Sequence, residues 1–351
     1  RDFRERQGLK NHMTSDYCGR HTTAVFFLTA VFSLPVCVAP AIAASADLDR
    51  ECVMNLAETA EGSMTLAEIR RQCTPAQGQI TEPSEPASEA VPSAIDQRLA
   101  AEREAAASPF TILAHRPNYF LVAAYNWEGW DSEFDNKNIE SQFQLSLKVP
   151  LAVGLFDDRM DIYGAYTNRS FWQMYNRGDS EPFRETNHEP EVWLQFQNDW
   201  KVWGLTNSLN TVGFAHQSNG RSGEFSRSWN RIYASFLFEK GNWTYDLKPW
   251  IWVSSDRETS DNPDIDDYMG HGEFRVSYGK NNHVVSGMFR NLLESGFDKG
   301  AVEFSWSFPV FDYPYLRGYL QYFYGYGESL IDYNQKVNRL GIGISVTDWR
   351  H

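Results

Sequence analysis

His216 and Ser218 stand two residues apart in a segment of alternating character, a spacing that suits nucleophilic catalysis. In a β-strand, residues two apart share one face, so the imidazole and the hydroxyl would lie on the same side. A histidine beside a serine is the minimum needed for a general base and an activated hydroxyl nucleophile. Val212 and Phe214 are in phase with this pair, which predicts that the shared face is apolar.

A third polar group that could orient the imidazole occurs in the next strand-like segment. Asn230 alternates in phase with Ile232 and Phe236, so its face is apolar as well. Antiparallel pairing would bring Asn230 beside His216 and Ser218. If these strands belong to a membrane barrel, the shared face is the lipid-facing wall, where polar groups are costly and call for a functional account. The spacing alone is a weak signal, because a histidine and a serine near a strand end are often only solvated polar residues.

The elements that must position these residues are strands. We count about 12 segments of alternating polarity after residue 109, each near the about 9–11 residues that a tilted strand needs to cross a bilayer. The sequence therefore predicts an all-β fold, a 12-stranded antiparallel transmembrane β-barrel over residues 109–351. The alternative is a soluble sandwich or lipocalin-like barrel, whose apolar face would point inward. Three segments show the alternation well: 142–149, 302–308 and 339–346.

The composition agrees with a barrel in an outer membrane. The 351 residues include 12 Trp, 17 Tyr and 23 Phe and carry a net charge of −14, which argues against a nucleic-acid partner. The mean hydropathy of −0.50 excludes a helical membrane protein. A barrel with a polar lumen, an apolar lipid face and aromatic girdles reconciles these values.

The first residues predict export. Arg20 precedes an apolar stretch that ends in Ala41-Ile42-Ala43, so residues 1–43 are predicted to be a signal peptide and are excluded from fold reasoning. Residues 44–108 are predicted to be an N-terminal periplasmic segment, helical over 47–73 and a Pro/Ala/Ser/Glu-rich linker over 74–108.

Two cysteines remain after the predicted cleavage, Cys52 and Cys73. Because an exported chain meets an oxidising compartment, a disulfide between them is our hypothesis, with two free thiols as the alternative. Thiol titration of the unreduced, denatured protein distinguishes the two.

Five blocks of the chain resemble the outer membrane phospholipase A family of bacteria, and the similarity runs from about residue 118 to near the C-terminus. The blocks are long and ordered, so the resemblance is specific. They are 182–187 (PFRETN), 216–222 (HQSNGRS), 226–231 (SRSWNR), 261–264 (DNPD) and 325–334 (GYGESLIDYN).

The resemblance implies a calcium-dependent enzyme that hydrolyses both acyl esters of membrane phospholipids and also lysophospholipids. By position, Ser218 would be the nucleophile, His216 the base, Asn230 the orienting residue, and the backbone amide of Gly220 the oxyanion donor. The family acts as a homodimer with the acyl chain in a cleft along the interface, where Asn168 occupies a place at which the family can carry Gln.

The resemblance also implies a Ca²⁺ site made of oxygen ligands. These would be the carbonyl of Arg221 and Ser226, together with Ser180 from a second subunit. Gly223 departs from relatives that carry an acidic residue there for a second calcium, and Asp261 is either a contributor to that site or an ordinary loop carboxylate. Two other functions stay open at this point: a non-catalytic, porin-like or structural barrel, and a soluble secreted esterase.

Overall fold

The computed structural model describes residues 92–130, 135–253, 260–311 and 313–350. The predicted signal peptide over 1–43, the predicted helix over 47–73 and the hypothetical Cys52–Cys73 disulfide lie outside the described residues.

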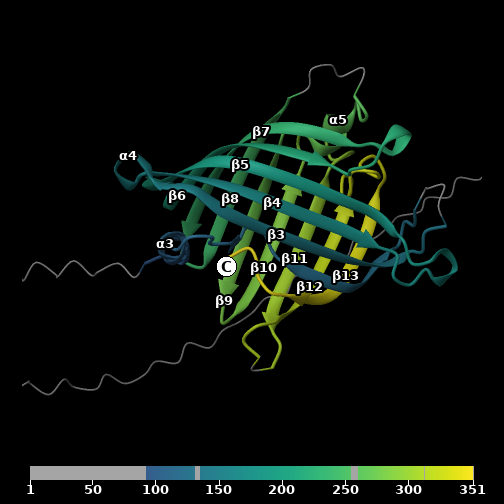
Figure 1. The fold of residues 1–351 in the computed structure, drawn as a ribbon, viewed down its shortest axis with the longest axis horizontal. Helices are drawn as coiled ribbons and strands as arrows, with labels where there is room; N and C mark the ends of the chain where they lie inside the picture. Colours follow the sequence, from purple (N-terminus) through teal and green to yellow (C-terminus); the bar gives the residue numbers. More distant parts are fainter. Residues whose placement is uncertain (1–91, 131–134, 254–259, 312, 351) are drawn as a thin grey trace, which may run out of the picture. The chain divides into compact units, whose positions relative to one another are not determined.

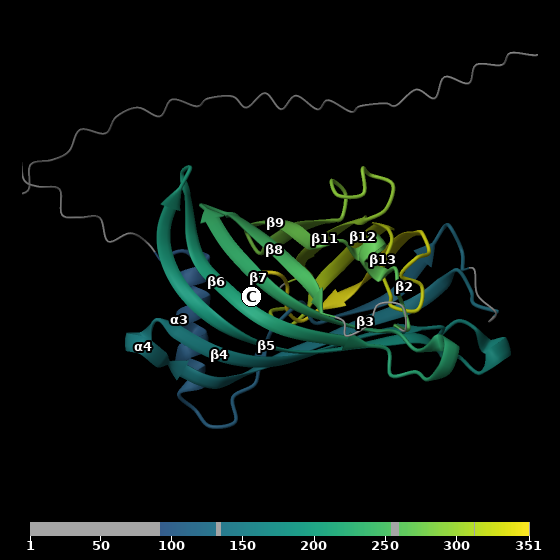
Figure 2. The same ribbon diagram turned by 90° about the horizontal axis from the view of Figure 1, so that it is seen from above.

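Twelve antiparallel strands form a closed barrel, as the sequence predicted (Figures 1 and 2). Each strand pairs with the next along the chain, and the ring closes where Ser345 of the last strand pairs with Tyr119 of the first. A two-residue strand, β1 (Leu113–Ala114), adds to one edge of β3. The barrel strands are β2 (Tyr119–Asn126), β3 (Ile139–Gly154), β4 (Met160–Trp172), β5 (Phe183–Val202), β6 (Leu205–Ser218), β7 (Ser228–Lys240), β8 (Trp243–Val253), β9 (Gly272–Lys280), β10 (His283–Arg290), β11 (Ala301–Pro309), β12 (Arg317–Gly325) and β13 (Val337–Ser345).

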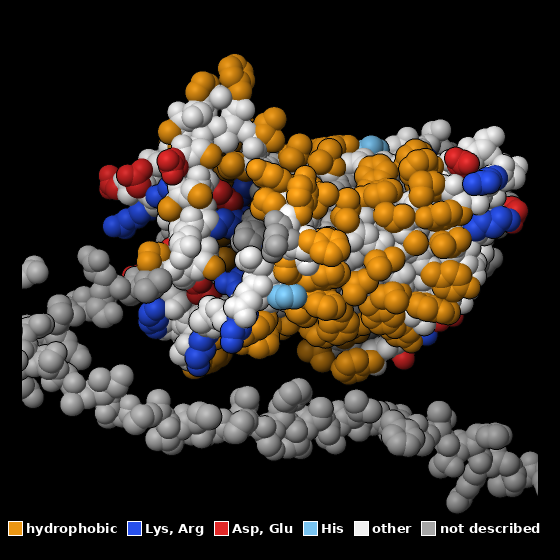
Figure 3. Space-filling view, turned by 90° about the horizontal axis from the view of Figure 1, so that it is seen from below, with side chains coloured by type: hydrophobic (Ala, Val, Ile, Leu, Met, Phe, Trp, Pro, Cys, Tyr) orange, Lys and Arg blue, Asp and Glu red, His pale blue; other side chains and the backbone are white. Residues whose placement is uncertain are grey.

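The outer wall of the barrel is apolar. In β11, Phe304 and Trp306 are 43% and 40% exposed, whereas Glu303 and Ser305, which alternate with them, are buried on the lumen side. Figure 3 shows the wall as a broad area of hydrophobic side chains, with charged side chains gathered at its ends. This face suits contact with lipid chains, so the soluble alternative with an inward apolar face is wrong.

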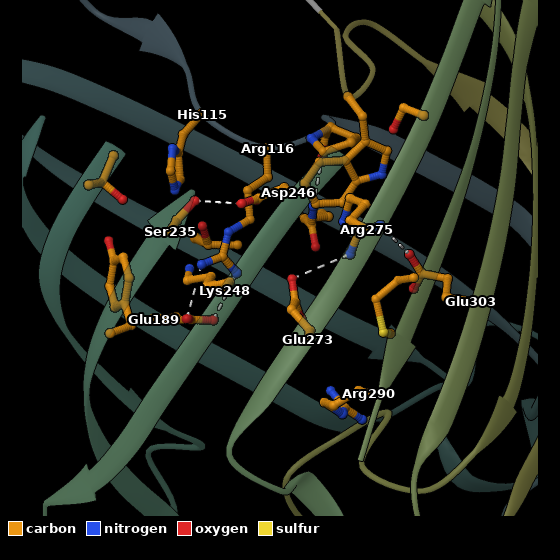
Figure 4. Close-up of a pocket in the computed structure, with 18 of the residues that line it drawn as sticks. His115, Arg116, Glu189, Ser235, Asp246, Lys248, Glu273, Arg275, Arg290 and Glu303 are labelled. Carbon is orange, nitrogen blue, oxygen red and sulfur yellow. Dashed lines mark hydrogen bonds and ion pairs between the residues drawn. The ribbon is translucent and has the colours of Figure 1, made fainter. Parts of the chain in front are cut away.

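Charged pairs line the lumen. Arg339 is fully buried and donates to Glu328 at 2.5 Å and to Gln321 at 2.7 Å. Arg116 pairs with Glu189 at 3.0 Å, and both side chains point into the cavity drawn in Figure 4. The cavity that these side chains line has a volume of about 280 Å³.

One longer helix and four short helical segments accompany the strands in the described part of the chain. They are α3 (Ala94–Ala106), α4 (Leu155–Asp158), α5 (Ile265–Met269), and the 3₁₀ turns η1 (Arg177–Asp179) and η2 (Gly223–Phe225). Among the described residues, none of the helices has the length and the apolar composition that crossing a bilayer would need. In Figure 1, α3 and α4 lie together at the left, away from α5.

Helix α3 lies where the sequence predicted a linker, which was expected to run through residue 108. The linker prediction is wrong for residues 94–106. Ser93 caps the helix by accepting from the Asp96 amide at 3.0 Å, and Ile95 and Leu99 are buried. On its inner side Glu102 pairs with Lys148 of β3 at 2.8 Å. The Ala- and Glu-rich composition suggested a solvated chain, but this buried ion pair and the two apolar contacts fix the helix on the barrel.

We expect acid to release α3 from the barrel. Burial raises the pKa of Glu102, but Arg98 and Lys148 outweigh it and hold that pKa below its usual value. The stabilisation is therefore complete above the unfolded pKa of about 4.3 and is lost as the pH falls through the lower folded pKa. Amide hydrogen exchange of residues 94–106 at pH 6 and pH 3, corrected for intrinsic rates, should show the loss of protection. Glu102→Gln should already weaken protection at pH 6, whereas the exposed Glu104→Gln should not. Equal protection of α3 at both pH values would contradict this account.

Candidate functional site

The pairing of β6 with β7 brings two of the predicted site residues into contact. His216 lies directly opposite Asn230 in the register, and its Nδ1 is 2.8 Å from the Asn230 Oδ1. The neighbouring outward residues Phe214 and Ile232 are 41% and 44% exposed. The His216–Asn230 pair therefore lies on the apolar outer wall, on the face that the alternation predicted.

Ser218 is the last residue of β6 and shares this face with His216. Both side chains are partly exposed, and no hydrogen bond joins the Ser218 hydroxyl to His216 in the described part of the chain. Catalytic hydrogen bonds often tighten only when substrate binds, so the shared face matters more here than the contact.

The partner of His216 decides which ring nitrogen can act as a base. The Asn230 carbonyl oxygen can only accept, so the Nδ1 facing it carries the hydrogen. In the neutral ring the Nε2 is then the free acceptor. A ring held in this tautomer can take a proton from a hydroxyl on its far side, which is the general-base arrangement.

One buried side chain shapes the loop between β6 and β7. The Asn219 Oδ1 accepts from the Arg221 amide at 3.2 Å and from the Arg227 amide at 3.0 Å, while its Nδ2 donates to the Phe225 carbonyl at 2.8 Å. Gly220 follows with φ of +65°, in the left-handed region that favours glycine. Asn219 belongs to the motif at 216–222, and its contacts with the loop backbone are seen in the structure.

The predicted calcium ligands Arg221 and Ser226 belong to this same loop. The Ser226 hydroxyl is 2.5 Å from the Asp261 Oδ2, so a hydroxyl and a carboxylate already lie side by side. Within the described residues there is no cluster of three or more His, Cys, Asp or Glu that could hold a metal. A site of one carbonyl, one hydroxyl and one carboxylate would not form such a cluster, and these all-oxygen donors fit a hard cation such as Ca²⁺. Ser180 lies exposed in the loop between β4 and β5, and no hydrogen bond joins it to the other three residues in the described chain.

The segment that carries Asp261 is itself held in place. The neighbouring Asn262 is fully buried, and its Oδ1 accepts from the Ser228 amide at 2.9 Å. Tyr333 donates to Asp264 from the loop between β12 and β13. Burial raises the pKa of Tyr333, and the hydrogen bond to Asp264 raises it further, so the phenol stays a donor. These contacts bring residues 260–264 to the start of β7.

Comparison with known proteins now gives the family. The sequence profile of the Phospholipase A1 family matches residues 95–346. The chain belongs to this family. Phospholipase A1 of Proteus vulgaris is 38% identical over 252 residues, covering 69% of this chain and 83% of the relative, and that of Escherichia coli K12 has the same identity and coverage.

Solved structures of phospholipase A1 relatives have the same barrel. The outer membrane phospholipase dimer of Salmonella typhi with bound calcium superposes with a TM-score of 0.64 and 37% identity, over 69% of this chain and 94% of the other. The outer membrane phospholipase A of Escherichia coli gives 0.63 and 36%, over 68% and 100%. The resemblance identified in the sequence is thus confirmed, and this member of the phospholipase A1 family is an outer-membrane β-barrel.

A second histidine lies beside Ser218 and was not predicted from the sequence. His188 of β5 is the direct register partner of Ser218, and it faces outward in the same direction. The alternation of β5 places His188 in phase with Pro190 and Val192, which is the signal that could have found it.

Proposed function

We propose that this chain is a calcium-dependent phospholipase that acts on both acyl positions of membrane phospholipids and on lysophospholipids. The His216–Asn230 pair on the apolar outer wall, with Ser218 on the same face, carries this proposal. A nucleophile on that wall can reach only molecules that lie in the membrane. The phospholipase A1 relatives and their outer-membrane structures support the same substrate class.

In the proposed reaction, the Ser218 Oγ attacks the ester carbonyl carbon while the His216 Nε2 takes the hydroxyl proton. The Gly220 amide donates to the oxyanion of the tetrahedral intermediate. As the intermediate collapses, His216 returns the proton to the leaving alkoxide of the lysophospholipid, and the acyl group stays on Ser218. Water, activated by the same imidazole, then releases the fatty acid, while Asn230 keeps the ring in its tautomer.

Calcium would be held by the Arg221 carbonyl and by Ser226, with Ser180 of the partner subunit completing the site and Asp261 close by. When bound, the ion supplies Lewis-acid stabilisation of the negative charge that develops on the ester oxygen. The calcium-bound dimer of the Salmonella typhi relative supports both the metal and the homodimer. A monomer would lack one ligand and one side of the acyl-chain cleft, so we propose that activity follows dimerisation.

The first test is fatty-acid release from mixed phospholipid–detergent micelles, with calcium and with excess chelator. We expect chelation to lower the rate by about 10²-fold or more, the usual effect of losing one stabilising group at an oxyanion. Readdition of Ca²⁺ should restore the rate, and Ser226→Ala should raise the calcium concentration needed for half-maximal activity. Heat-modifiable gel mobility controls for folding. No release from folded, dimeric protein would favour the porin-like or structural barrel instead.

A further inference from the structure

A row of polar residues crosses the apolar wall beside the proposed nucleophile. Asn168 of β4 pairs with His188 of β5, and His188 pairs with Ser218 of β6. All three face outward, where polar atoms are expensive unless they are satisfied or functional. The proposed catalytic triad of Ser218, His216 and Asn230 includes only Ser218 of this row. His188 and Asn168 therefore need their own explanation.

The neighbours of His188 fix its tautomer. The Tyr166 hydroxyl lies 2.6 Å from the His188 Nδ1, and the Asn168 Nδ2 lies 3.4 Å from the same atom. The Asn168 Oδ1 is engaged with the Ser170 hydroxyl at 3.0 Å, so it is the amide nitrogen that faces the ring, and an amide nitrogen only donates. The Nδ1 of His188 is therefore an acceptor, and its Nε2 carries the hydrogen.

Ser218 thus lies between two histidines held in opposite tautomers. The Nδ1 of His216 donates to Asn230, which leaves its Nε2 free to accept a proton. The Nδ1 of His188 accepts, which makes its Nε2 a donor and unsuited to deprotonate Ser218. His216 is suited to be the base, and His188 is suited to stabilise negative charge.

The Nε2 edge of His188 lies close to Gly220, whose amide is the proposed oxyanion donor. Its Nε2 lies 3.7 Å from the point at which a Cβ on Gly220 would stand, next to the proposed oxyanion amide. This Nε2 has no hydrogen-bond partner among the described residues, although its Nδ1 is held by Tyr166. The Nδ1 side of the ring is therefore positioned by Tyr166, and the Nε2 hydrogen points away from that contact.

We propose that His188 donates a hydrogen bond from its Nε2 to the ester oxygen during hydrolysis, as a second oxyanion donor beside the Gly220 amide. The inference rests on the proposed function, because it needs Ser218 to attack an ester. Tyr166 and Asn168 are then positioning residues that keep the hydrogen on the Nε2. No bond to His188 is made or broken in this role.

The test compares wild type, His188→Phe and His188→Gln on two substrates, a phospholipid and a diacylglycerol that lacks the phosphate. We expect His188→Phe to lower kcat by about 10²-fold on both substrates, as loss of one oxyanion donor does, with KM little changed. His188→Gln keeps an N–H donor and should recover at least about tenfold of that loss. His283→Phe, which removes an outward histidine of β10 stacked on Trp306, is the matched control and should leave kcat unchanged.

The outcomes separate this inference from the proposed function. Wild-type release that does not depend on Ser218 would overturn the proposed function itself. Where Ser218 is required, a kcat of His188→Phe within about twofold of wild type would overturn only the donor role. A loss confined to the phospholipid would assign His188 to the phosphate instead, and a His188→Gln variant no better than His188→Phe would also contradict donation.

Discussion

Replacing Ser218 by alanine is expected to reduce phospholipid hydrolysis by at least about 10⁴-fold, because loss of a serine nucleophile removes the covalent route and leaves only weak residual catalysis. The loss should appear in kcat rather than in KM, since lipid still binds the apolar wall. Fatty-acid release at saturating calcium measures the effect. Heat-modifiable gel mobility should stay that of the wild type, because Ser218 is partly exposed at the end of β6.

A double variant tests whether Ser218 and His216 act together. Once Ser218 is alanine, adding His216→Phe should cost almost nothing more, because residues that act together show strongly non-additive losses. Ser108→Ala, at an exposed serine after α3, controls for the assay. Further multiplicative loss in the double variant would mean that His216 acts elsewhere and not as the base for Ser218.

The face of each candidate residue could be predicted from the sequence, because strand periodicity is two. His216 and Ser218 belong to one strand, so their shared face follows from spacing alone. Asn230 required one further assumption, that β6 and β7 pair. The structure has that pairing, with Asn230 directly opposite His216. The sequence could place Asn230 on the outer face, but the register is what brings it to 2.8 Å from the ring.

Features that depend on longer-range register could not be predicted in this way. His188 lies 30 residues before Ser218 in the chain. The alternation of β5 gives the face of His188, but only the register places it opposite Ser218. The docking of α3 depends on the Glu102–Lys148 pair between segments 46 residues apart in the chain. Local composition carries no information on either contact. The calcium ligands carry no local signature either, because a backbone carbonyl has no sequence preference, and only the family resemblance indicated Arg221.

The loops around the site are tied together by one buried arginine in the lumen. Arg184 of β5 binds Glu140 of β3 through two hydrogen bonds, of 2.9 Å and 2.8 Å. It also pairs with Asp332 of the loop between β12 and β13, and its guanidinium stacks 3.6 Å from the centre of the Trp130 ring. The Arg221 side chain donates to the backbone carbonyl of Arg184. The backbone of β5 therefore also supports the loop that carries Arg221, a proposed calcium ligand.

Arg184→Met should therefore destabilise the barrel by about 3–5 kcal/mol, because it leaves two buried carboxylates without their counter-ion. Glu140 is fully buried and Asp332 is 5% exposed, so water cannot take the place of the lost guanidinium. Denaturant unfolding in detergent micelles measures the change.

Adding Glu140→Gln to Arg184→Met should recover part of the lost stability by removing one of the unpaired charges. Lys137→Met, which breaks the exposed pair with Asp135, should cost no more than about 1 kcal/mol. Equal costs for the two single variants would show that the buried network contributes no more than a surface ion pair.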